Sequence, residues 1–160
     1  MHTRLDYSKA APGSVQAMYK IQKYVDASGL EHSLLELVKT RVSQINGCAF
    51  CIDMHTKDAR AAGETEQRLY GLNAWREAPY YSDRERAALA WAEVVTLISQ
   101  THATDEEYEA ARAQFSEEEL VKLTMAVIAI NGWTRLAVSF RTKPGTYQPR
   151  GAGHAMAAVG

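Results

Sequence analysis

The distribution of proline constrains the fold of this chain more than any other sequence feature. The four prolines of the 160-residue chain stand at positions 12, 79, 144 and 149, which leaves the long stretches 13–78 and 80–143 without any. Proline inside a helix removes a backbone hydrogen bond and clashes with the preceding turn, so these stretches permit long helices. They also lack the sustained alternation of β-branched residues that is typical of strands. The sequence therefore predicts an all-α protein.

Helix start and stop signals divide the chain into about seven expected helices. Ser82, Thr104 and Ser116 are each followed three residues later by glutamate, which is the spacing of a capping box. Three glycines in the first half of the chain mark expected helix ends, because glycine adopts the left-handed stop conformation without steric cost. The expected helices cover about 14–28, 32–45, 48–62, 65–77, 83–100, 105–114 and 117–141.

Length and composition predict one domain followed by a tail. A chain of 160 residues can bury a sizeable core, and we expect a helical domain over residues 1–142. Residues 143–160 are rich in Gly, Ala and Pro, so we expect a tail that is flexible or lies across a neighbouring subunit. The segments 83–100 and 117–141 are apolar on nearly every side, as helices are in a core or a subunit interface. A homo-oligomer is favoured on this ground, and a compact monomeric bundle is the alternative.

Charge and hydropathy exclude several classes of partner. The net charge of −1 gives no electrostatic attraction to nucleic acid or to an anionic membrane. The N-terminus lacks the apolar segment of a secretory signal, and the longest uncharged run, Leu123 to Thr134, is too short to span a bilayer. We therefore expect a cytoplasmic location. In that reducing compartment a C-x-x-C pair is more often catalytic or metal-binding than structural.

The two cysteines of the chain stand in one motif, Cys48-Ala49-Phe50-Cys51, with His55 after it and Glu36 before it. Asn46-Gly47 predicts a turn, so the cysteines open the next helix at positions i and i+3, about 5–6 Å apart at Cβ. That spacing permits a disulfide or a shared metal ion. His55 lies on the same face, and the helix N-terminus favours the reactive thiolate.

Glu36 is expected to complete a proton relay. If the turn folds the two helices antiparallel, Glu36 and His55 differ in level by only about 4–5 Å, which a glutamate side chain spans. A carboxylate on one imidazole nitrogen would fix the tautomer and leave the other nitrogen to take a proton from a thiol. The alternatives without a functional role are a solvated glutamate and a surface histidine.

Zinc is the chief alternative to redox chemistry, because Cys48, Cys51, His55 and Glu36 make four possible ligands. Structural zinc sites usually recruit two separated ligand pairs, so the redox interpretation is favoured. The other histidines, at positions 2, 32, 102 and 154, have no partner at ligand spacing and are interpreted as surface residues. No cofactor is expected, since no glycine fingerprint for flavin or nicotinamide follows a strand.

The spacing of Glu36, Cys48, Cys51 and His55 resembles the core motif of the alkylhydroperoxidase D-like (AhpD-like) family, within the carboxymuconolactone decarboxylase-like superfamily. The resemblance extends over most of residues 15–142 and is carried by residues 34–70, 85–98 and 130–140. It implies an all-α fold that assembles as trimers or hexamers. One departure is Phe50, since some peroxidase members carry histidine directly before the second cysteine.

The resemblance also implies a thiol-dependent peroxidase. Cys48 and Cys51 would cycle between dithiol and disulfide, Glu36 and His55 would be the proton relay, and Cys51 would attack a small peroxide. A dithiol reductant that the sequence does not identify would reset the pair. A metal-binding or ligand-binding module without turnover, and a slow redox sensor, are the alternatives. Decarboxylase activity is not expected, because decarboxylases of the superfamily do not rely on a C-x-x-C pair.

Overall fold

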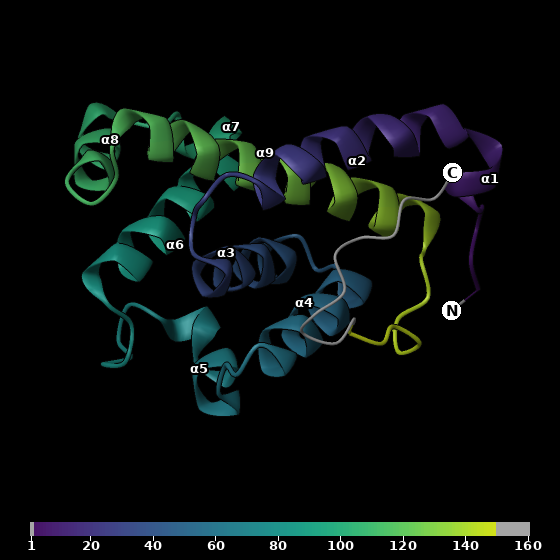
Figure 1. Cartoon of the computed structure of the whole chain (residues 1–160), viewed down its shortest axis with the longest axis horizontal. Helices are drawn as coiled ribbons and strands as arrows, with labels where there is room; N and C mark the ends of the chain where they lie inside the picture. The colour runs from purple at the N-terminus through teal and green to yellow at the C-terminus, as the bar shows by residue number, and fades with distance from the viewer. Residues whose placement is uncertain (1, 150–160) are drawn as a thin grey trace.

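The computed structural model describes residues 2–149 and contains helices but no strand within that part of the chain (Figure 1). The prediction of an all-α fold is confirmed. In chain order the elements are α1 (Tyr7–Ala10), α2 (Pro12–Asp26), α3 (His32–Ile45), α4 (Ala49–Ala61), α5 (Glu66–Tyr70), η1 (Leu72–Ala74), α6 (Asp83–Thr96), α7 (Ile98–Thr101), α8 (Asp105–Arg112) and α9 (Glu117–Phe140).

The three predicted capping boxes are all present, and each begins a helix. Ser82, Thr104 and Ser116 accept a hydrogen bond from the backbone N–H three residues later, and the glutamate side chain there accepts one from the backbone N–H of the cap residue. These reciprocal bonds satisfy amide groups that have no partner inside the helix. They explain why the predicted starts of α6, α8 and α9 coincide with the observed ones.

Ser116 gives a direct test of capping at the longest helix. We expect Ser116→Ala to lower the free energy of unfolding by about 1 kcal/mol, because α9 then loses its N-cap acceptor. Ser139→Ala, at an exposed position of the same helix, is the control and should change stability by less than about 0.5 kcal/mol. Urea denaturation followed by circular dichroism measures both, and equal losses would contradict the role of the cap.

Two of the expected helices are broken in the structure. The segment 65–77 contains only the short α5 and η1, because Tyr80 packs against Gly71, where a Cβ atom would meet the Tyr80 hydroxyl at 2.0 Å. The segment 83–100 is interrupted at Leu97, whose backbone leaves the helical region. The Thr101 hydroxyl then donates to the Val94 carbonyl at 2.8 Å. Packing and local hydrogen bonds thus override the helical pattern in both places.

Helix α3 lies at the centre of the molecule and packs against α4, α6 and α9 (Figure 1). It supplies Leu34 and Val38 to the larger apolar cluster, which also contains both cysteines, and Leu37 to a second cluster with Trp75 and Leu89. α2 runs along α9, and α8 packs against α6. Polar residues carried on α3 are therefore enclosed by other helices.

α9 is, within the described chain, the one helix whose length and composition alone would let it cross a membrane. In the structure it packs against α2, α3 and α6 as a core helix does. It leaves Val121, Ile128 and Val138 exposed. These apolar side chains agree with the expected homo-oligomer, which stays a prediction.

Residues 143–149 follow α9 and turn back along α4, as the yellow segment of Figure 1 shows. Three hydrogen bonds join this segment, which we call the strap, to Asp53, Lys57 and Asp58 of α4. The predicted tail 143–160 thus begins against its own domain. Its remainder, residues 150–160, lies outside the described residues, and contact with a neighbouring subunit stays a prediction.

Candidate active site

The cysteine pair sits at the first turn of α4. Gly47 adopts a φ of 63°, a conformation that favours glycine, and so ends the connection from α3. Cys48 is the N-cap of α4, and its sulfur accepts a hydrogen bond from the Cys51 amide at 3.3 Å. The two residues form a disulfide with Cα atoms 5.3 Å apart, and each is only 1% exposed. The structure therefore places the pair as the spacing predicts and in its oxidised form.

The turn that carries Cys48 is held by the core helix. The Asn46 side-chain amide donates to Asn131 at 3.0 Å and to Thr134 at 3.1 Å, and both of these α9 residues are buried. Buried polar groups that satisfy one another fix a single arrangement, because any displacement leaves one of them without a partner. The register between the cysteine helix and α9 is set by these bonds.

His55 and Glu36 meet as the antiparallel arrangement of α3 and α4 predicts. His55 Nδ1 lies 2.9 Å from Glu36 Oε2, and the residues are 7% and 3% exposed. The contact uses Nδ1, so Nε2 is the nitrogen that remains for proton exchange with a thiol. His55 is one helical turn beyond Cys51 on the same face of α4.

Lys39 is a site residue that the sequence analysis did not identify. It is buried, and its Nζ lies 2.9 Å from Glu36 Oε1. Burial raises the pKa of Glu36, but the hydrogen bond from His55 and the charge of Lys39 outweigh burial and hold the pKa at about 2. Glu36 is thus a carboxylate throughout the physiological pH range. Its spacing of three residues from Lys39 on one helix was the available signal.

Asp58 is the second site residue that the sequence analysis missed. Single ligand atoms of Glu36, His55 and Asp58 all lie within 4.8 Å of one another. Burial and the nearby Glu36 charge raise the pKa of Asp58, against the lowering effect of a hydrogen bond from Tyr147. The signal was present in the sequence, because Asp58 follows Cys51 by seven residues and His55 by three, on one helix face.

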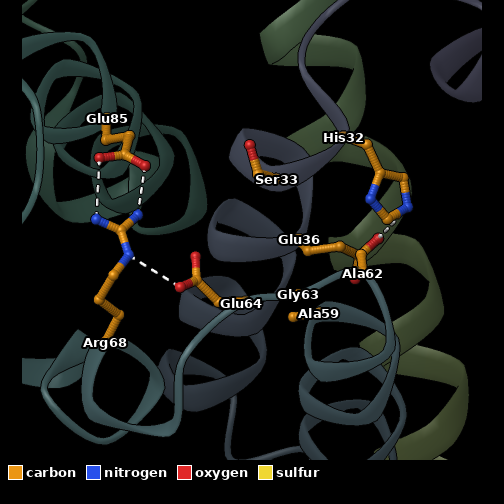
Figure 2. A pocket seen from close by; sticks show the side chains of 9 residues that line it. All are labelled: His32, Ser33, Glu36, Ala59, Ala62, Gly63, Glu64, Arg68 and Glu85. Atoms are coloured by element: carbon orange, nitrogen blue, oxygen red, sulfur yellow. Dashed lines mark hydrogen bonds and ion pairs between the residues drawn. The ribbon is translucent and has the colours of Figure 1, made fainter.

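His32 is more than the isolated surface residue that the sequence suggested. Its side chain is 65% exposed, but its Nε2 lies 3.8 Å from Glu36 Oε1 (Figure 2). His2 and His102 are exposed as predicted, and His154 lies outside the described residues. His32 therefore marks the point at which the buried carboxylate comes nearest to the surface.

A cavity of about 270 Å³ opens beside this histidine (Figure 2). Its walls come from α3, α4, α5 and α6, and Arg68 spans it by pairing with Glu64 and Glu85. The lining residues are His32, Ser33, Glu36, Ala59, Ala62, Gly63, Glu64, Arg68 and Glu85. The cysteines do not line it, so the cavity approaches the relay from the side of Glu36.

The residues are poorly arranged for a metal ion. Cys48 and Cys51 are bonded to each other, and the remaining group of Glu36, His55 and Asp58 has the Lys39 ammonium within it at Glu36. A cation there would be repelled by Lys39 and would compete with it for the same carboxylate. We expect protein purified without chelator to hold well under one equivalent of zinc by elemental analysis. About one zinc ion per chain would favour the metal-binding alternative.

These features define a class of helical proteins that carry a buried cysteine pair beside a glutamate–histidine relay. Residues 12–94 match the model of the carboxymuconolactone decarboxylase family. The chain belongs to that family and, within its superfamily, to the AhpD-like proteins.

Individual relatives agree with this placement. The chain is 45% identical over 139 residues to the uncharacterized protein YdfG of Bacillus subtilis, a match that covers 87% of this chain and 95% of YdfG. It is 47% identical to a protein of unknown function from Agrobacterium tumefaciens, described as a candidate antioxidant defence protein AhpD, with a TM-score of 0.88 over 91% of this chain and all of that one. The debrominase Bmp8 shares the fold, with a TM-score of 0.74 and 17% identity over 86% of this chain and 74% of that one.

Proposed function

We propose that this protein is a thiol-dependent peroxidase that reduces a small peroxide with the Cys48–Cys51 pair. The observation that carries the proposal is a disulfide at a helix N-terminus, one turn before a histidine that is bonded to a buried carboxylate. The helix N-terminus stabilises a thiolate, and His55, one helical turn beyond Cys51, is the proposed base for the thiol. The likeness to a candidate antioxidant defence protein supports the same activity.

The reaction follows from these positions. His55 accepts the thiol proton of Cys51, and the thiolate attacks one peroxide oxygen while the O–O bond breaks. The proton passes to the departing oxygen, which leaves as an alcohol, and Cys51 becomes a sulfenic acid. Cys48 then attacks the Cys51 sulfur, the hydroxyl group leaves as water with the Cys48 proton, and the disulfide forms. Two electrons pass from the thiol pair to the peroxide.

Glu36 orients His55 and stabilises it when it is protonated. Because the Glu36 carboxylate stays ionised, it favours the imidazolium that forms when the thiol gives up its proton. Lys39 holds the second oxygen of Glu36, so the carboxylate cannot rotate away from His55 without losing that ion pair.

Phe50, between the two cysteines, packs against the apolar cluster that contains them.

The cycle closes when an external dithiol reduces the disulfide by thiol–disulfide exchange. We propose a reducing cytoplasm as the compartment, where a disulfide is generally catalytic rather than structural. We also propose a homo-oligomer, a trimer or a hexamer, with no nucleic acid or membrane partner.

A thiol titration tests the proposed function. The reduced, metal-free protein should lose both thiols on addition of one equivalent of an organic peroxide and regain them with dihydrolipoamide. Peroxide consumption by a protein with both cysteines changed to serine measures the peroxide loss that does not involve the pair. Two thiols that stay free after prolonged exposure would contradict the peroxidase proposal.

A further inference from the structure

We propose that Asp58 and Tyr147 are positioning residues of the redox site: Asp58 is a second carboxylate beside His55, and the strap holds it there. The inference extends the proposed function, since it concerns the histidine that takes the thiol proton. Its test does not require peroxide turnover.

The first step concerns the helix face on which Asp58 lies. Cys51, His55 and Asp58 follow one another at intervals of four and three residues, so they line one face of α4. One carboxylate oxygen of Asp58 lies within 4.8 Å of a carboxylate oxygen of Glu36 and of a ring nitrogen of His55. Along α4, His55 thus lies one turn after Cys51 and one turn before Asp58, and Glu36 reaches it from α3.

The second step concerns what holds Asp58. The Tyr147 hydroxyl donates to Asp58 Oδ1 at 2.7 Å, and the contact joins residues 89 positions apart in the chain. The Lys57 ammonium donates to the Tyr147 carbonyl at 3.0 Å, and the Gly145 amide donates to Asp53 Oδ2 at 3.1 Å. The strap therefore binds α4 at Gly145 and at Tyr147 itself, and these contacts bring the Tyr147 hydroxyl to Asp58.

The third step concerns charge. The charged groups that act on Asp58 come from α3 (Glu36 and Lys39) and α4 (His55), and the strap adds the Tyr147 hydroxyl. A carboxylate close to an imidazole favours its protonated form, and a hydroxyl that donates to the carboxylate keeps it ionised. Through the Tyr147 hydroxyl, the strap thus holds a second carboxylate close to the His55 ring.

Histidine resonances in the reduced protein test this inference directly. We expect Asp58→Asn to lower the pH at which His55 loses its proton by about 1, since a nearby carboxylate is removed. Tyr147→Phe keeps the ring and removes only the donor, so we expect a smaller change in the same direction. The His55 signal is identified by its absence from a His55→Gln protein.

Asp53→Asn is the matched control: it also removes a carboxylate from α4, but on another face, and the asparagine oxygen can still accept the bond from the Gly145 amide. It should leave the His55 midpoint within about 0.2 pH units of the parent value. An unchanged midpoint in Asp58→Asn and Tyr147→Phe, or an equal change in Asp53→Asn, would overturn the inference. Because Tyr147 lies outside every helix, Tyr147→Phe keeps the test valid if Asp58→Asn fails to fold. If the parent protein does not turn over peroxide, the proposed function is contradicted, but the measured change in the His55 midpoint still stands.

Discussion

Changing Cys51 to serine should abolish catalytic peroxide reduction, with a loss of at least about a thousandfold in turnover. Serine keeps the size of the side chain but has no thiolate at neutral pH, so the group next to His55 can no longer attack the O–O bond. Peroxide consumption in the presence of excess dithiol measures the effect. The fold should be retained, because Cys48 still caps α4.

Cys48→Ser is the matched control for the order of attack. That variant keeps Cys51 and should consume one equivalent of peroxide, after which a sulfenic acid accumulates on Cys51 that a dimedone-type reagent can trap. The reverse result, a trapped acid on Cys48 in the Cys51→Ser protein, would exchange the roles of the two cysteines. The pair would still be the redox centre in that case.

Glu36→Gln should combine a large loss of stability with a large loss of rate. The substitution leaves the buried Lys39 without its counter-charge and replaces the charged partner of His55 with a neutral amide. We expect the free energy of unfolding at neutral pH to fall by about 3 kcal/mol and the peroxide rate constant to fall about 100-fold. Urea denaturation and stopped-flow kinetics measure the two effects.

The pH dependence of stability tests the ionised state of Glu36 separately. Its pKa is lowered from 4.5 to about 2, so its stabilising contribution is complete above pH 4.5 and is lost as the pH falls towards 2. Each pH unit of this difference is worth about 1.4 kcal/mol, which gives about 3 kcal/mol in all. Glu36→Gln should therefore remove most of the acid sensitivity in that pH range.

Glu93→Gln is the control that separates stability from chemistry. Glu93 is also largely buried, and it pairs with Arg41 at 2.7 Å, with no contact to the relay. Arg76 and Trp75 also hydrogen-bond to it, and together with Arg41 they lower its pKa in spite of burial. We expect this variant to be less stable but to reduce peroxide at the parent rate. An equal loss of rate in both variants would show that Glu36 acts only through the fold.

Local signals in the sequence were sufficient for the helix starts and for the four-residue motif. The capping boxes of Ser82, Thr104 and Ser116 depend on residues three positions apart, and the meeting of Glu36 with His55 depends only on one turn between two helices. Both are short-range relations, so the printed sequence contains them.

The residues that were missed depend on long-range packing. Lys39 looked solvated because α3 carries a polar pattern, and only the enclosure of α3 by α4, α6 and α9 shows that this pattern is internal. Tyr147 lies far along the chain from Asp58, and no periodicity connects a residue after α9 with the third turn of α4. The broken helices at Gly71 and Leu97 have the same cause, since side-chain contacts decide them.

The disulfide joins residues only three positions apart within one helical turn. A crosslink that closes so short a loop restricts the unfolded chain little and stabilises the fold by at most about 2 kcal/mol on the chain-entropy account. The disulfide ties no distant segments together. The Cys48 cap and the α3–α4 packing stabilise the protein with a reduced cysteine pair as well. We therefore expect the scaffold to stay folded when the bond is reduced, which suits a reagent that is used and renewed.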